Sequence, residues 1–169
     1  MRNLEYKARI EDLESYRARA HALGAGSEGE LRQTDTYFKV ASGRLKLREI
    51  AGRPGELIFY QRDEEGANRV SDYEVFRTTE AAALRDILGA ALGVLAVVRK
   101  RRTLLVVDGA RIHLDNVEGL GNFLEMEVPV HDSDVHASET INRLLRELGL
   151  TWAQCIRASY LDLALEAKQ

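Results

Sequence analysis

Charged side chains recur at every second position in several segments that otherwise resemble β-strands. Near the start of the chain Glu5 and Lys7 alternate with apolar or aromatic neighbours, and far downstream Glu125 and Glu127 flank Met126. Successive side chains of a strand point to opposite faces of the sheet, so each segment has one charged and one apolar face. This is the inverse of an ordinary sheet, whose sequestered face is apolar.

The same pattern recurs along the chain, so several strands share one charged face of mixed sign. It places Lys46 and Arg48, Lys100 and Arg102, and Arg111, His113 and Asp115 on the charged faces of three further segments. Unpaired buried charge is costly, so such a face must be wet, internally paired or filled by a charged ligand. Spacing alone also allows a solvated outer face with cross-strand ion pairs. The strongly apolar opposite faces favour a covering of helices outside and a polar lumen inside.

Eight strands are expected, at approximately 2–10, 34–40, 44–51, 56–62, 68–77, 95–107, 110–117 and 122–131. Asp108-Gly109 lies between two alternating segments and is the strongest hairpin signal. Helices are expected at approximately 11–23, 79–92, 133–148 and 152–164. A long open sheet would expose its edges, so we predict an α+β fold in which an eight-stranded antiparallel β-barrel has helices packed outside.

Composition limits the classes of partner. The 24 Lys and Arg against 27 Asp and Glu give a net charge of −3, so no membrane or nucleic-acid partner is expected. The single cysteine, Cys155, excludes an internal disulfide framework. The first residues lack the apolar run of a signal peptide, and no stretch approaches the ~20 apolar residues of a membrane span. We therefore expect one cytoplasmic domain over residues 1–169, with a homodimer as an open alternative.

The charged face has the residues needed for phosphate and metal binding. Its candidate phosphate-binding residues are Lys46, Arg48, Arg62, Lys100 and Arg102. Its candidate ligands for Mg²⁺ or Mn²⁺ are Glu5, Glu74, Asp115, Glu125 and Glu127. The candidate catalytic residues are Lys7, Arg48 and Lys100. A small-molecule triphosphate that bridges the cations and the metal would neutralise both sets, as phosphoryl transfer requires.

An ordered set of motifs over nearly the whole chain resembles a known family. The set comprises Glu5-Tyr6-Lys7, Lys46-Leu47-Arg48, Lys100-Arg101-Arg102, His113-Leu114-Asp115, Gly119-Leu120-Gly121 before Glu125-Met126-Glu127, and Ser159-Tyr160. The chain resembles CYTH domains, the triphosphate tunnel metalloenzymes, and most of all bacterial proteins similar to class IV adenylyl cyclases. The family also includes thiamine triphosphatases and inorganic tripolyphosphatases. The resemblance implies an antiparallel tunnel whose basic residues bind a triphosphate while glutamates bind a divalent metal.

The chain departs from the family pattern at two positions. Asn3 stands where the opening Glu-x-Glu-x-Lys motif has its first glutamate, and Arg62 stands where a lysine is common. His113 is interpreted as a hydrogen-bonded interior side chain, and Tyr160 either closes one end of the tunnel or packs in the core. We expect a metal-dependent triphosphate enzyme, either a hydrolase or a cyclase. A non-catalytic nucleotide or polyphosphate binder is the alternative.

Overall fold

The chain forms an eight-stranded antiparallel sheet. The computed structural model describes residues 3–62, 71–130 and 134–168. The strands are β1 (Asn3–Arg9), β2 (Gly26–Phe38), β3 (Arg44–Ile50), β4 (Gly55–Arg62), β5 (Ser71–Thr78), β6 (Val94–Val107), β7 (Ala110–Val117) and β8 (Gly121–Pro129). They lie in the order β1-β8-β7-β6-β2-β3-β4-β5, and every pair is antiparallel. The predicted fold class is confirmed.

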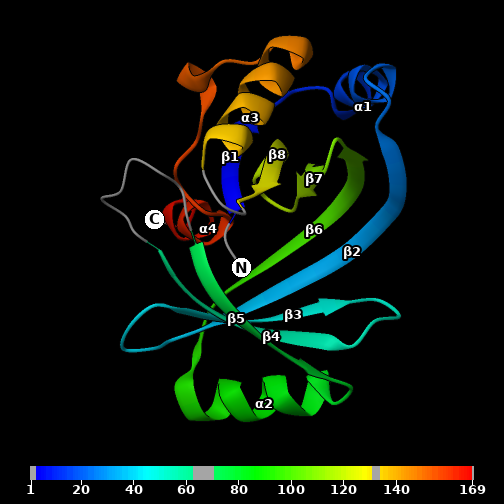
Figure 1. The fold of residues 1–169 in the computed structure, drawn as a ribbon. Helices are drawn as coiled ribbons and strands as arrows, with labels where there is room; N and C mark the ends of the chain where they lie inside the picture. The colour runs from blue at the N-terminus through cyan, green and yellow to red at the C-terminus, as the bar shows by residue number, and fades with distance from the viewer. Residues whose placement is uncertain (1–2, 63–70, 131–133, 169) are drawn as a thin grey trace.

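The sheet curls strongly around a central space (Figure 1). Strands β1 and β5 are its two edges, and in the described ranges they pair with β8 and β4 alone. The architecture is therefore a strongly curled, tunnel-like half-barrel.

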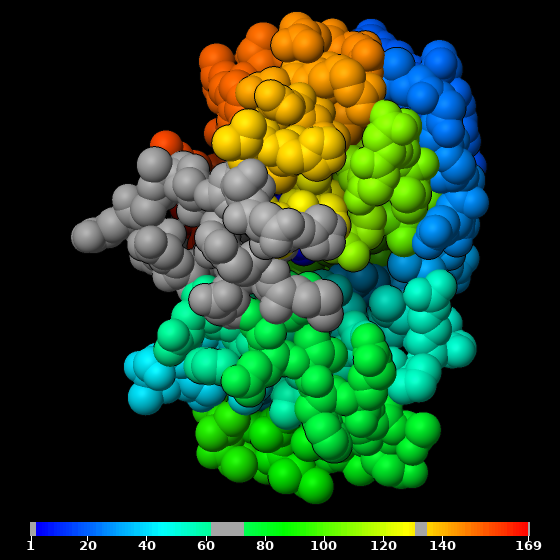
Figure 2. Space-filling model, viewed as in Figure 1, coloured from blue at the N-terminus to red at the C-terminus, as the bar shows by residue number. Residues whose placement is uncertain are grey.

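Four helices accompany the sheet in the described residues. They are α1 (Leu13–Ala22), α2 (Ala81–Leu92), α3 (Asp134–Leu148) and α4 (Tyr160–Glu166). Figure 2 shows α3 in yellow and orange at one end of the molecule and α2 in green at the other. No helix of the described chain is long and apolar enough to cross a membrane.

The helix predicted at 152–164 is two separate elements. A 3₁₀ turn (Trp152–Gln154) follows Thr151, and α4 begins after Ser159. Thr151 and Ser159 each form a capping box with the residue three positions on. Two caps define two helix starts, so the apolar spacing does not form one continuous helix.

The Asp108-Gly109 hairpin is confirmed. Asp108 has φ 48° and Gly109 has φ 75°, and the flanking residues Val107 and Ala110 pair with each other. Positive φ at both central residues is the geometry of a type I′ turn, which Asp-Gly adopts readily. This turn fixes the register of β6 against β7.

The apolar faces of β1, β7 and β8 lie outside the curl, under α1 and α3. On β1, Leu4, Tyr6 and Ala8 belong to the main apolar core together with Ile141 and Leu144 of α3. A second helix, α2, packs against β2 and β3. The charged alternate positions are left facing the central space, as the sequence predicts.

Candidate functional site

The curl encloses a cavity of about 410 Å³ that is lined by inward-facing residues of all eight strands. Its lining contains eight charged residues at alternate positions of β1, β3, β6 and β8: Glu5, Lys7, Lys46, Arg48, Lys100, Arg102, Glu125 and Glu127. Because β1 and β8 pair in register with Glu5 opposite Glu127, residues more than 100 positions apart share one wall. The cavity is the candidate site.

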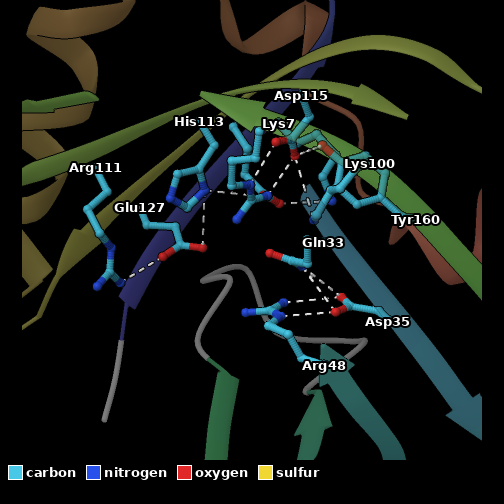
Figure 3. A network of polar contacts seen from close by, with 12 residues as sticks. Lys7, Gln33, Asp35, Arg48, Lys100, Arg111, His113, Asp115, Glu127 and Tyr160 are labelled. Atoms are coloured by element: carbon cyan, nitrogen blue, oxygen red, sulfur yellow. Dashed lines mark hydrogen bonds and ion pairs between the residues drawn. The ribbon is translucent and has the colours of Figure 1, made fainter. Parts of the chain in front are cut away.

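Asp35 of β2 holds two cations of β3. Its carboxylate accepts hydrogen bonds from Lys46 Nζ at 3.1 Å and from Arg48 Nε and Nη2 at 3.0 and 3.2 Å. Gln33 also donates to Asp35, at 3.0 Å (Figure 3). Burial alone would raise the pKa of Asp35, but Arg48, Lys46 and Lys100 hold it well below its usual range. Asp35 therefore stays ionised and holds the Lys46 ammonium group and the Arg48 guanidinium group in position.

A second group of charges surrounds Asp115 of β7. Arg102 donates two hydrogen bonds to Asp115, at 2.7 and 2.6 Å, and one to Glu125 at 2.8 Å. Lys100 lies 3.7 Å from Asp115. Burial opposes ionisation of Asp115, yet Arg102 and Lys100 bring its pKa to about 2. The Asp115 carboxylate is thus already paired with Arg102 and Lys100 of the neighbouring strand.

Tyr160, the first residue of α4, closes this group. Its hydroxyl donates to Asp115 at 2.8 Å, and the ammonium groups of Lys7 and Lys100 lie 4.4 and 4.6 Å from its ring centroid. Tyr160 is buried and also belongs to the core cluster around α4. The core interpretation of Tyr160 is therefore confirmed, and its hydroxyl in addition borders the cavity.

The two cavity lysines of β3 and β6 have lowered pKa values. Burial and the neighbouring Arg48 lower the pKa of Lys46 to about 8, against the opposing effect of Asp35. Burial and Arg102 lower the pKa of Lys100 to about 7, and Asp115 only partly offsets them. An incoming anion would favour the charged form of each lysine.

His113, Glu125 and Glu127 form the candidate metal centre. One ligand atom from each lies within 4.8 Å of the others. His113 Nδ1 is 3.6 Å from Glu125 and 3.7 Å from Glu127, too far for good hydrogen bonds, and this buried nitrogen has no hydrogen-bond partner in the described structure. Burial opposes ionisation of both glutamates, but Lys7, His113 and Arg102 hold the pKa of Glu125 well below its usual range, and His113 and the arginines lower that of Glu127. Two anionic oxygens and an unbonded imidazole nitrogen fit Mn²⁺, and Mg²⁺ through the oxygens.

Three predicted site residues differ in position from the rest. Glu74 is exposed on β5, where its neighbours Tyr73 and Val75 line the cavity, so it faces the opposite side of the sheet. A strand read one residue out of register exchanges its two faces, and the short segment around Glu74 leaves that register weakly specified. Asp115 is buried among the cations, apart from the group of His113, Glu125 and Glu127. The side chain of Arg62 lies outside the described residues.

Sequence reasoning missed Asp35 and undervalued His113. Asp35 lies between Thr34 and Thr36 in an otherwise ordinary strand, and its signal is that aspartate is depleted in strand interiors. The expected hydrogen bond of His113 is absent at Nδ1, which lies 3.6 Å from Glu125 and 3.7 Å from Glu127, the latter labelled in Figure 3. Partners on neighbouring strands decide both roles, and the sequence does not show which strands are neighbours.

Solved structures share this fold at low sequence identity. A Pyrococcus horikoshii protein aligns with a TM-score of 0.86 and 23% identity over 95% of this chain and 98% of that one. A Vibrio parahaemolyticus protein described as a candidate adenylate cyclase has a TM-score of 0.75 and 20% identity over 94% of each chain. A Hippeastrum protein described as a candidate adenylyl cyclase with a dominant triphosphatase activity has a TM-score of 0.70 and 17% identity over 100% of this chain and 97% of that one.

No curated protein sequence matches the chain significantly. The family model of the CYTH domain, however, matches residues 1–160, which is nearly the full length. The match spans all eight strands, and with them the whole charged cavity. The chain belongs to the CYTH domain family.

Proposed function

We propose that this protein is a metal-dependent triphosphatase that binds its substrate in the central cavity. The observation that carries the proposal is the joint presence, in one cavity of about 410 Å³, of seven basic side chains and the cluster of His113, Glu125 and Glu127. The seven are Lys7, Lys46, Arg48, Arg77, Lys100, Arg102 and Arg111. A triphosphate carries the negative charge that such a set of cations neutralises, and its size suits the smaller end of ligand cavities.

The cations are positioned before the substrate arrives. Asp35 fixes Arg48 through two hydrogen bonds, and Asp115 fixes Arg102 in the same bidentate manner. Rigid cations need little reorganisation when charge develops on the transferred phosphoryl group, which is the main source of catalysis in this reaction class. We assign Lys7, Arg48 and Lys100 to the stabilisation of that charge.

Glu125, Glu127 and His113 would hold the metal, with Glu5 on the adjoining wall. When bound, Mg²⁺ or Mn²⁺ supplies charge neutralisation at the phosphate oxygens. Asn3, which also lines the cavity, offers a neutral amide where a second carboxylate of β1 would stand. The chain thus supplies a mixed ligand set in which most of the negative charge comes from β8.

Hydrolysis requires fewer precisely positioned reacting groups in the cavity than cyclisation does. Water attacks the terminal phosphorus, a new P–O bond forms, the anhydride P–O bond breaks, and orthophosphate and a diphosphate leave. Cyclisation would require in addition a ribose hydroxyl aligned with the α-phosphate. The triphosphatase activity described for the structurally similar Hippeastrum protein supports the simpler reaction.

The test is turnover of ATP, tripolyphosphate and thiamine triphosphate, each with Mg²⁺ or Mn²⁺. We expect release of orthophosphate, and we expect Glu127→Gln to lose most turnover while it still binds tripolyphosphate. The swap is nearly isosteric and removes one charge from the candidate metal centre. Glu118→Gln, on an exposed glutamate outside the cavity, is the matched control and should keep wild-type turnover.

Other products would assign another function to the same cavity. Cyclic AMP with pyrophosphate would make the protein a cyclase. Tight binding of tripolyphosphate without turnover under any metal would make it a binding protein. Equal turnover by wild type and Glu127→Gln would remove Glu127 from the metal centre.

A further inference from the structure

A groove on the outer side of the sheet carries a second concentration of positive charge. It has a volume of about 810 Å³ and lies where β3 and β7 end against the long strands β2 and β6. Four arginines line it, Arg32 of β2, Arg53 after β3, and Arg99 and Arg101 of β6, and all four are exposed. We call this feature the outer groove.

The arginines of the outer groove face away from the central cavity. Arg32 precedes Gln33, and Arg99 and Arg101 flank Lys100; Gln33 and Lys100 line the central cavity and also border the outer groove, whereas the three arginines line the groove alone. Alternation along a strand therefore puts these three arginines on the outer face of the sheet. They are a separate set of charges that the proposed reaction does not use.

The arrangement of these charges is unfavourable without a counter-ion. Arg32 and Arg101 are direct partners across the β2–β6 pair, and like charges in that position destabilise a sheet. None of the four arginines forms an ion pair or side-chain hydrogen bond within the described part of the chain. Of the two glutamates that line the groove, Glu49 is already bound by Arg85 at 3.0 Å.

A helix terminus adds to the positive potential. Ala81, the first residue of α2, lines the outer groove, and Glu80 before it provides no side-chain cap. The amino end of a helix carries partial positive charge and is favourable for anions. Four guanidinium groups beside such an end match the oxygens of phosphate, which arginine binds in a bidentate manner.

We propose that the outer groove is a second anion site, which binds a small phosphate-bearing molecule of the class of short polyphosphates and nucleotides. A small ligand fits better than a long nucleic acid, because the whole chain has a net charge of −3 and Glu49 and Glu118 interrupt the basic surface. The four arginines take no part in the proposed reaction, and the site needs no metal.

The test uses inorganic tripolyphosphate and calorimetry on the full chain at low salt. Wild type should bind two molecules per chain, one in the cavity and one in the outer groove. The double variant Arg99→Glu and Arg101→Glu should lose the second site, with affinity there at least roughly tenfold weaker, and should keep the cavity site. Arg48→Ala should show the opposite loss.

A double variant of equal charge change controls for the overall field. Arg17→Glu with Arg146→Glu, on α1 and α3, alters net charge by the same amount away from the groove and should leave both sites intact. Both doubles should retain the wild-type circular dichroism spectrum, since Arg99, Arg101 and Arg146 are exposed and the Arg17 side chain is 42% exposed. The control thus separates a local site from long-range attraction.

Three results would overturn the proposal. The first is one-site binding by wild type, and the second is two-site binding by the groove variant. The third is equal loss of the second site in the groove variant and the control. Tighter groove-dependent binding of a single-stranded RNA oligonucleotide without a 5′-triphosphate would reject the small-molecule assignment.

Discussion

Asp35 shows how a single buried residue organises the site. Its side chain is 4% exposed and binds Lys46 and Arg48, which carry two of the cavity's positive charges. A buried charge pair adds little net stability, but removal of one partner leaves the other uncompensated. The structural role of Asp35 is thus to make two adjacent cations tolerable in the absence of ligand.

Replacement of Asp35 by asparagine should therefore destabilise the free protein and increase its response to ligand. We expect Asp35→Asn to lower the free energy of unfolding by about 3–5 kcal/mol, because Lys46 and Arg48 lose their anion. Tripolyphosphate should restore more stability to the variant than it adds to wild type, since its charge replaces the missing one. Urea unfolding with and without tripolyphosphate measures both effects.

Asp86→Asn on α2 is the matched control, because it removes the same charge from a side chain that is 75% exposed. Its unfolding free energy should stay within about 0.5 kcal/mol of wild type. A variant at Asp35 as stable as this control would mean that the cations do not need their partner.

At the scale of elements, local patterning predicts most strands but not where the longest one begins. Alternation and turn residues locate β3, β4, β6, β7 and β8 to within a residue or two. Strand β2 begins at Gly26 rather than near Thr34, because its first half is polar and is held by pairing with β6. Gly29, with φ 101° at a register shift, further hides the pattern. Long-range pairing defines this part of the strand, and a local sequence window does not contain it.

The residues of the candidate site can be predicted from the sequence about as well as the strands can. Seven of the inward charges follow from period two alone, since Lys7, Lys46, Arg48, Lys100, Arg102, Glu125 and Glu127 all line the cavity. The prediction fails at Glu74, where the strand register decides which face of the sheet the side chain takes. It also misses Asp35, whose role depends on a partner on another strand. Periodicity gives the face of a residue, whereas strand order gives its neighbours.

Helix α4 links the C-terminal segment to the cavity through its first turn. Ser159 Oγ accepts from the backbone N–H of Asp162, and Arg44 of β3 donates to Ser159 and lies 2.9 Å from Asp162. Tyr160 follows at once and reaches Asp115. The cap therefore determines where the tyrosine hydroxyl meets the charged wall.

Loss of this cap should loosen α4 before it affects the sheet. Ser159→Ala should reduce the free energy of unfolding by about 1 kcal/mol, the usual effect of removing an N-cap hydroxyl. Hydrogen exchange should speed up in residues 160–166 and stay unchanged in β6 and β7. Ser42→Ala, at an exposed bend, is the control and should alter neither quantity. Unchanged exchange in α4 of the first variant would show that core packing alone holds the helix.

At the scale of the whole molecule, alternate charged side chains line the central cavity, and the apolar outer faces of β1, β7 and β8 pack under α1 and α3. Cations and carboxylates neutralise one another around the cavity, so the free protein tolerates a buried network. The balance leaves Lys46 and Lys100 with pKa values of about 8 and about 7, because burial and neighbouring arginines disfavour their charged forms. A triphosphate that enters this network adds negative charge and must raise both values.

Binding of tripolyphosphate should therefore be coupled to proton uptake. At pH 8 Lys100 is mostly neutral and Lys46 is about half protonated in the free protein, so the complex should gain about 1.4 protons, roughly 0.9 at Lys100 and roughly 0.5 at Lys46, as both become charged. Affinity should fall as the pH rises from 7 to 9, because each neutral lysine must first be protonated. Calorimetry at pH 8 in two buffers of different ionisation enthalpy gives the proton number. The double variant Lys46→Arg and Lys100→Arg keeps its charge at every accessible pH and corrects for protonation of the ligand itself, so its uptake should be lower than that of wild type by about 1.4 protons. Equal proton numbers for the two proteins would mean that both lysines are already charged before the triphosphate binds.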